Sequence, residues 1–229
     1  LMNIIITGAS GNLGQAVVRQ FLKANWTVIG LVIPGDKIPM DIKDPKFVRV
    51  EVDLADETHT ALAIGRIIKK RGTIDAAVLT AGGFAMGTIA QTSSKDLLQQ
   101  YKLNVETTYH AARPIFQQML TQKKGRIFMI GARPATDMQQ AKGMTAYALS
   151  KSLIFRLAEL MNAEAKGTDV VTSVVVPSII DTPQNRKSMP DADPANWMDP
   201  AQMAEIIHFH TTPAADGLRE PVLKMYNKA

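Results

Sequence analysis

The feature of this sequence that most constrains its fold is a glycine-rich turn between an apolar run and an amphipathic segment. Asn3–Thr7 is rich in β-branched residues, and Leu13–Ala24 places its apolar residues on one helical face. The turn between them reads Thr7-Gly8-Ala9-Ser10-Gly11-Asn12-Leu13-Gly14. Glycine allows a tight turn and a close approach to phosphate, and a helix N-terminus offers free N–H groups. Three glycines alone are ordinary turn residues, but between a strand and a helix they predict a binding site for a dinucleotide pyrophosphate.

Strand and helix patterns alternate along the rest of the chain. Strands are predicted at Thr27–Ile33, Phe47–Val52, Ile74–Thr80, Arg126–Ile130, Val170–Val176 and Pro221–Met225. Helices are predicted at Thr58–Lys70, Lys95–Gln122, Ala146–Ala165 and Ala201–His210. Because Val170–Val176 is almost free of polar residues, we expect it at the centre of the sheet. The alternation predicts an α/β fold: a single-domain, Rossmann-type, doubly wound parallel sheet over residues 1–229, with helices on both faces.

One long segment lacks any periodic pattern. Between Pro177 and Pro200 the chain is rich in Pro, Asp, Asn and Ser, which predicts a single long loop. Loops of this length inside a compact domain are usually functional. We therefore expect residues 178–199 to form a lid over the substrate, mobile when no ligand is bound.

Composition excludes several classes of function. The sequence has no cysteine, so disulfides, thiolate metal sites and cysteine nucleophiles are absent. No apolar run approaches the ~20 residues that span a membrane, and no basic leader precedes the first strand, so a cytoplasmic protein is expected. The net charge is +5, but the basic residues are scattered and lack interleaved aromatics, which argues against a nucleic-acid partner. His208-Phe209-His210 has no third ligand arranged around it, so no metal site is predicted.

A tyrosine and a lysine one helical turn apart are the best catalytic candidates. In Tyr147-Ala148-Leu149-Ser150-Lys151 the phenol and the ammonium group fall on the same face of a predicted helix. A nearby ammonium group favours the phenolate, so we expect Lys151 to lower the pKa of Tyr147 and allow it to shuttle a proton. An exposed helical pair is the ordinary alternative. The position of the pair after a dinucleotide loop, between two buried strands, favours catalysis.

The Thr7–Gly14 turn and the Tyr147, Lys151 pair together resemble the short-chain dehydrogenase/reductase family, and the resemblance covers essentially the whole chain. It implies that Tyr147 acts as general acid or base. It also implies that Lys151 tunes Tyr147 and holds the ribose hydroxyls of the nicotinamide nucleotide. Asn104, in the long helix, matches an Asn that anchors a proton-relay water in the family.

The resemblance implies further cofactor contacts. Asp53 matches the adenine-contacting Asp, with Leu54 beside it, and Thr80-Ala81-Gly82-Gly83 matches a cofactor-supporting motif that usually begins with Asn. Pro177-Ser178-Ile179-Ile180-Asp181-Thr182 resembles a Pro-Gly segment that leads to a Thr. The Ile179 backbone and Thr182 are therefore candidates for holding the carboxamide and the phosphates. Alternatively, Pro177 and Thr182 are ordinary loop residues with no role in binding.

One departure from the family pattern affects the substrate. A catalytic Ser normally ends the fifth strand, where this chain has Ile130-Gly131-Ala132-Arg133. The dihydropteridine reductase-like branch shares this gap. It also resembles this chain at Asn25-Trp26, at Ala81-Gly82-Gly83-Phe84 and along the lid from Asp181 to Asp193. The resemblance implies hydride transfer from NAD(P)H to a carbonyl or imine-like carbon, with a dihydropteridine-type ring as one candidate substrate. The alternative is an NAD(P)-binding sensor that has lost catalysis together with the Ser.

Cofactor choice is normally set at the end of the second strand, where an acid binds the 2'-hydroxyl of NAD and repels the 2'-phosphate of NADP. That position falls here at Val32 or Ile33, and neither is acidic. Asp36 and Lys37 follow on the next loop and would favour opposite cofactors, unless both are merely solvated turn residues. The missing acid gives a slight preference for NADP over NAD. The resemblance further implies a homodimer or homotetramer, associated through the Lys95 and Ala146 helices.

Overall fold

A computed structural model, which describes residues 1–36 and 42–228, contains a seven-stranded sheet in the order β3-β2-β1-β4-β5-β6-β7. Every neighbouring pair of strands is parallel. The strands are β1 (Asn3–Thr7), β2 (Thr27–Val32), β3 (Phe47–Glu51), β4 (Ala76–Leu79), β5 (Lys124–Ile130), β6 (Asp169–Pro177) and β7 (Val222–Met225).

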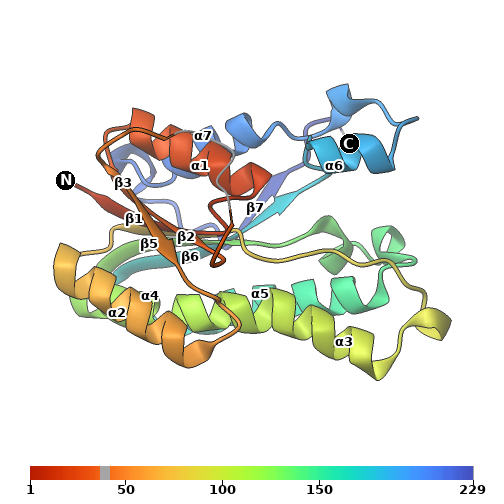
Figure 1. Ribbon diagram of the computed structural model, residues 1–229, viewed down its shortest axis with the longest axis horizontal. Coiled ribbons are helices and arrows are strands. Elements are labelled where there is room, and N and C mark those ends of the chain that lie inside the picture. The colour runs from red at the N-terminus through yellow and green to blue at the C-terminus, as the bar shows by residue number, and fades with distance from the viewer. Residues whose placement is uncertain (37–41, 229) are drawn as a thin grey trace.

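Helices cover both faces of this sheet, as Figure 1 shows, with α1 and α7 on one side and α2, α4 and α5 on the other. Their bounds are α1 (Asn12–Lys23), α2 (Glu57–Arg71), α3 (Ser94–Tyr101), α4 (Thr107–Gln122), α5 (Thr145–Glu164), α6 (Pro183–Ser188) and α7 (Pro200–Phe209). Short 3₁₀ turns lie at Ile89–Gln91, Arg133–Ala135, Met138–Ala141, Pro194–Asn196 and Pro213–Ala215. Each face buries its own apolar cluster against the strands. The predicted doubly wound fold is confirmed.

Two local predictions were wrong, and a third needs a refinement. The helix expected over Lys95–Gln122 forms without a break from Ser94 to Gln122, but a π-helical turn at Lys102–Glu106 divides it into α3 and α4. The strand expected at the centre, β6, lies next to the edge strand β7, whereas β4 occupies the middle. β6 is nevertheless buried along nearly its whole length, because strands flank it on both sides and helices cover both faces. An apolar run therefore shows that a strand is buried, and it does not show that the strand lies at the centre of the sheet.

The second error concerns the segment 178–199, which is not one irregular loop. It contains α6 and the 3₁₀ turn Pro194–Asn196. The signal was present in the sequence, since Thr182 followed by Pro183 is a helix N-cap followed by proline in the first turn. Within the part of the chain that the structure describes, no helix combines the length and apolarity that crossing a membrane requires.

Candidate active site

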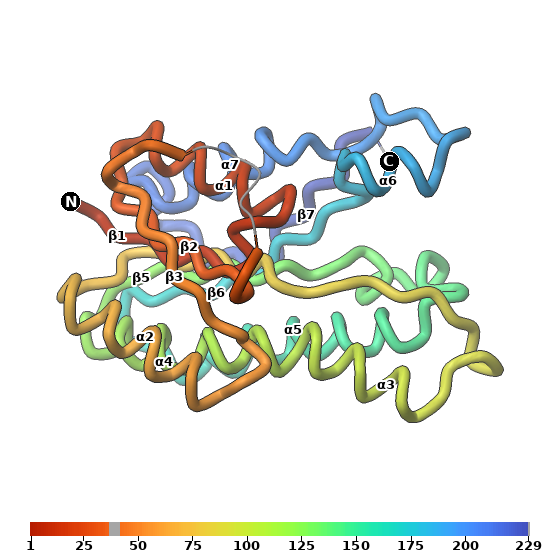
Figure 2. Tube along the Cα trace, in the orientation of Figure 1, coloured from red at the N-terminus to blue at the C-terminus, as the bar shows by residue number. Residues whose placement is uncertain are grey.

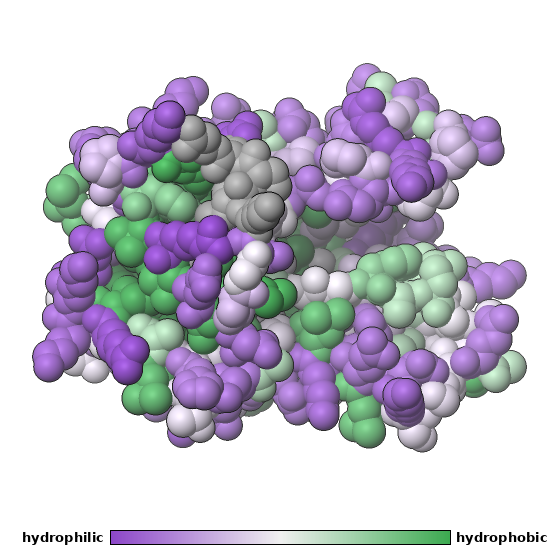
Figure 3. Space-filling model, viewed as in Figure 1, coloured by the Kyte–Doolittle hydropathy of each residue, from purple (hydrophilic) through white to green (hydrophobic). Residues whose placement is uncertain are grey.

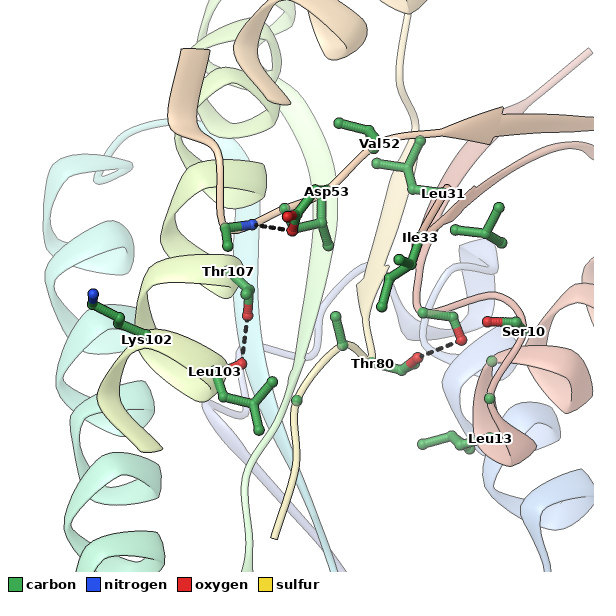
Figure 4. A pocket seen from close by; sticks show the side chains of 18 of the residues that line it. Ser10, Leu13, Leu31, Ile33, Val52, Asp53, Thr80, Lys102, Leu103 and Thr107 are labelled. Atoms are coloured by element: carbon green, nitrogen blue, oxygen red, sulfur yellow. Dashed lines mark hydrogen bonds between the residues drawn. The ribbon is translucent and has the colours of Figure 1, made fainter. Parts of the chain in front are cut away.

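The main cavity lies at the carboxyl ends of the strands, where the chain order reverses between β1 and β4. It has a volume of about 1080 Å³. In Figure 4, Ser10 and Leu13 of the glycine turn face Lys102 and Leu103 across it, and Asp53 lies at its far end. The structure gathers there ten of the predicted cofactor residues: Gly8, Ser10, Gly11, Asn12, Leu13, Gly14, Asp53, Leu54, Ala81 and Gly82.

The glycine turn has the shape of a phosphate cradle. Gly8 has a φ of +62°, and a Cβ at this residue would lie 2.9 Å from Thr80 Oγ1. A Cβ on Gly14 would lie only 2.1 Å from the Gly8 carbonyl oxygen. Gly11 is the N-cap of α1 and provides no side chain to bond the first N–H groups of the helix. The residues present therefore fit a pyrophosphate, which would approach the backbone closely and bind at the helix N-terminus.

The adenosine end of the cavity is shaped by the ends of β2 and β3. Leu31, Val32 and Ile33 supply an apolar wall. Asp53 accepts a hydrogen bond from Ala55 N at 3.0 Å, which fixes the turn after β3, and Leu54 beside it is buried. Lys37, one of the two residues predicted to influence cofactor choice, lies outside the described residues.

Two threonines join the ends of β1 and β4. Thr80 Oγ1 donates to the Thr7 carbonyl at 2.7 Å, and Ala81 N donates to Thr7 Oγ1 at 3.2 Å. Thr80 stands where the family motif usually has Asn. Its hydroxyl supports the sheet edge beside the cradle, which is half of what the resemblance implied for this motif.

Asn104 lies inside the π-helical turn and is fully buried. Its Oδ1 accepts from Gly83 N at 2.9 Å, and its Nδ2 lies within hydrogen-bond distance of the Gly83 carbonyl, Gln100 Oε1 and Ser150 Oγ. Its own carbonyl accepts from Thr108 Oγ1 at 2.8 Å. The amide thus holds the β4 loop against α3 and α5.

Tyr147 and Lys151 lie one turn apart in α5, but they do not interact as expected. Lys151 Nζ donates to the Ile130 carbonyl at 2.8 Å, and burial lowers its pKa to about 8. The Tyr147 ring packs edge-on against Phe84, with 4.9 Å between ring centroids, and burial raises the pKa of its phenol to about 12. The expectation that Lys151 lowers the pKa of Tyr147 is therefore wrong for this structure. Desolvation by burial is the cause of the pKa shift in both groups.

The end of β5 has no room for a side chain at Gly131. A Cβ on Gly131 would lie 2.6 Å from Val174 Cγ1 and 3.0 Å from the Phe155 ring. A serine at Gly131 would displace these core side chains. The glycine is therefore required by the packing of β5 against β6 and α5, and Ala132 beside it is buried and has no hydroxyl.

The predicted lid approaches the cleft from the other side. Ile179 accepts from Met198 N at 2.7 Å, and the Thr182 side chain accepts from Asn185 N at 3.1 Å as the N-cap of α6. Figure 3 shows the molecule hollowed between the segment that carries α6 and the helical layer beneath the sheet. A hydrogen bond crosses from the lid to the glycine turn, where Asn12 Nδ2 donates to Gln184 Oε1 at 2.8 Å.

Seven predicted site residues do not line the main cavity: Gly83, Asn104, Tyr147, Lys151, Pro177, Ile179 and Thr182. Conversely, the sequence did not point to Lys95, Leu98, Gln99, Lys102, Leu103 and Thr107, which line it from α3, the π-helical turn and α4. Their spacing of three, four and seven residues marks one face of a helix, so the signal existed without a motif to identify it.

The His208-Phe209-His210 segment is structural. The His208 ring packs edge-on against Phe21, with 5.2 Å between centroids, and burial lowers its pKa. Among residues 1–36 and 42–228, no group of three or more His, Cys, Asp or Glu side chains could hold a metal ion.

Comparison with known proteins identifies the family. The family model for short chain dehydrogenases matches residues 2–193. The chain belongs to this family. It is therefore an NAD(P)-dependent oxidoreductase by family membership.

Several relatives are similar along most of their length. Oxidoreductase UcpA of Salmonella typhimurium is 27% identical over 89% of this chain and 79% of its own. Dihydropteridine reductase of Dictyostelium discoideum is 28% identical over 89% of this chain and 84% of its own. The solved structure of ElxO with NADP bound superposes with a TM-score of 0.88 and 21% identity, over 98% of this chain and 96% of that one, and so shares the fold.

Proposed function

We propose that this short-chain dehydrogenase reduces a carbonyl or imine-like carbon in a flat ring. NAD(P)H, when bound, supplies the hydride. The observation that carries the proposal is the pair Tyr147 and Lys151, which places a protonated phenol one helical turn before a buried lysine, at the same sheet edge as the glycine cradle.

The roles of the protein groups follow from their chemistry. With a pKa of about 12, Tyr147 keeps its proton at neutral pH. It can donate this proton to the carbonyl oxygen or imine nitrogen of the substrate when the neighbouring carbon receives the hydride. The charge of Lys151 would stabilise the phenolate that this donation leaves. Asn104 acts as a positioning residue, because its amide holds Gly83 and Ser150 beside these two groups. The Ile179 backbone and Thr182 would hold the nicotinamide end under the lid.

The proposed substrate class rests on the apolar residues around Tyr147. The segments after β4 and β5 run side by side in Figure 2, joined by Gly87 N to the Gly143 carbonyl at 2.7 Å. They expose Phe84, Met86 and Met138, with 58%, 66% and 64% of each side chain accessible. Flexible methionines beside an aromatic ring suit a planar ligand. With no hydroxyl at Gly131 or Ala132 to polarise a carbonyl, an imine-like ring that accepts hydride and proton, such as a quinonoid dihydropterin, fits best.

A substrate panel tests this function. NADH and NADPH oxidation would be followed by absorbance with quinonoid dihydropterin, aromatic ketones, aliphatic ketones and sugars. We expect the highest kcat/KM with the planar ring compounds. Activity confined to aliphatic or sugar carbonyls would reject the substrate class. Tight nucleotide binding with no turnover on any compound would favour the sensor alternative, which the missing hydroxyl supports.

We also propose that copies of the chain associate through the helical layer of α3, α4 and α5. Contiguous exposed apolar surface commonly marks a protein interface. These helices expose several large apolar side chains: Leu97, Leu98 and Tyr101 on α3, Tyr109 on α4, and Leu149, Leu153 and Leu160 on α5. Light scattering should give a dimeric or tetrameric mass, and a monomer at micromolar concentration would contradict the proposal.

A further inference from the structure

An acidic side chain outside the second strand is hydrogen-bonded to a residue that lines the nucleotide cavity. Ser10 lines the cavity, and its Oγ donates to Asp36 Oδ2 at 2.7 Å. The turn after β2 explains this reach. Asp36 N donates to the Ile33 carbonyl at 3.0 Å, with Pro34 and Gly35 at the two central positions and a φ of +82° at Gly35. These are the features of a type II turn, which reverses the chain and returns Asp36 to the glycine turn.

The position of this carboxylate matches a function that the strand end lacks. The side chains of Val32 and Ile33 are apolar, so neither side chain can accept a hydrogen bond from an adenosine hydroxyl. Both residues line the same cavity as Ser10. A carboxylate bonded to Ser10 therefore stands between the glycine turn and the end of β2, where the adenosine ribose of a dinucleotide is held.

Among residues 1–36 and 42–228, the cation bonded to Asp36 is Arg49, and it does not pair with the carboxylate. Arg49 Nη2 donates to the main-chain carbonyl of Asp36 rather than to its side chain, and it pairs with Glu51 at 2.7 Å. Gly11, inside the glycine turn, carries no charge. The described groups around Ser10 therefore present one carboxylate and one internally paired arginine. A 2'-phosphate at this rim would be repelled, whereas a 2'-hydroxyl would gain a charged acceptor.

We infer that Asp36, folded back by the Ile33–Asp36 turn and anchored by Ser10, selects NAD(H) over NADP(H). This inference rests on the proposed nucleotide-binding function and assigns the adenosine specificity of that site. It reverses the slight preference for NADP that the strand-end residues alone suggested. A hydrogen bond to a charged group, together with phosphate repulsion, corresponds to a preference of about 10- to 100-fold in Kd.

The test is the Kd of each nucleotide, measured by nicotinamide fluorescence on the intact protein. Wild type should bind NADH at least about tenfold more tightly than NADPH. Asp36→Asn keeps the size of the side chain and removes its charge, so it should bring the two Kd values close together, mainly by tightening NADPH. Ser10→Ala should narrow the gap in part, because the carboxylate loses its anchor. Asp44→Asn is the matched control: Asp44 caps Lys46 N at 2.8 Å and does not line the cavity, so its removal should leave the ratio unchanged.

Each outcome is decisive. Equal Kd values in wild type, tighter NADPH, or an unchanged ratio in Asp36→Asn would overturn the role of Asp36 while leaving the nucleotide site intact. Failure to bind either nucleotide would reject the proposed function together with this inference. If Asp36→Asn and Asp44→Asn change the ratio of the NADPH and NADH Kd values equally, the change is due to net charge alone. That outcome would also overturn the role of Asp36.

Discussion

The two halves of the cleft are built by different means. The half beside β1 and β2 is formed mainly by backbone, with Gly8 and Gly14 packed too closely for any side chain. The half beside β5 and α5 depends on two side chains, the half-buried Tyr147 and the buried Lys151, and the same desolvation moves their pKa values in opposite directions. A backbone cradle recognises a ligand by shape. A desolvated pair of ionisable side chains has shifted pKa values, and the cost of desolvating it lowers the folding stability of the protein.

The largest effect is expected from removing one oxygen in the side-chain half. Tyr147→Phe keeps the ring that packs on Phe84 and removes the proton donor, so kcat should fall about 10²- to 10⁴-fold while the Kd for the nucleotide stays nearly unchanged. Steady-state kinetics and fluorescence titration measure the two quantities. The control is Tyr109→Phe, which removes the same oxygen from an exposed tyrosine of α4. Comparable turnover in the Tyr147 variant would mean that the two halves do not divide binding from chemistry.

In the backbone half, adding a single methyl group at a glycine should be enough to disturb folding and binding, because there is no space for it. A methyl group at Gly14 would lie 2.1 Å from the Gly8 carbonyl, so Gly14→Ala should cost about 1–3 kcal/mol of folding stability and weaken nucleotide binding. Gly65→Ala makes the same change inside α2, where nothing lies within 4 Å. It should stabilise the protein by roughly 0.5–1 kcal/mol. Chemical denaturation distinguishes the two. Equal effects would show that the cradle tolerates side chains and is not shaped by close packing.

The contrast between the halves also explains what the sequence could predict. The Thr7–Gly14 turn has a geometry that few residue types permit, so its pattern identified six residues that line one cavity, whereas Asp53, Leu54, Ala81 and Gly82 were found only through the family resemblance. The sheet followed from strand and helix periodicity, because burial on both faces leaves a pattern in each segment. Helix caps were also readable, as Thr182 and Pro183 show in hindsight.

What could not be predicted depends on contacts between distant segments. The direction of Lys151 Nζ depends on the Ile130 carbonyl, 21 residues away, and the full engagement of the Asn104 amide depends on a π-helical turn that has no sequence signature here. The Ser10–Asp36 hydrogen bond likewise joins residues 26 apart. Propensity and spacing describe neighbours along a helix or strand, and they do not specify which polar atoms tertiary packing will bring together.

The smallest effect concerns the folding stability lost by burying the charge of Lys151 in the side-chain half. Below about pH 8 Lys151 is charged in both the folded and the unfolded protein, so the folded state bears the full penalty of a buried charge. Between about pH 8 and its ordinary pKa of 10.5, only the unfolded state keeps the proton, so this residue's contribution to stability rises with pH. Lys151→Met removes the charge and also the hydrogen bond to Ile130. At pH 7 it should raise the free energy of unfolding by about 1–2 kcal/mol, while abolishing turnover.

The pH dependence separates this effect from ordinary repacking. Denaturation curves of wild type and Lys151→Met should converge as the pH rises from 7 to 10, because the wild-type penalty is relieved when the buried amine deprotonates. Lys69→Met, at an exposed lysine of α2, should show neither the gain nor the convergence. A Lys151 variant that is less stable than wild type at pH 7 would mean that the ammonium group stabilises the fold. The charge of Lys151 would then contribute to folding stability in the side-chain half, as close packing does in the backbone half.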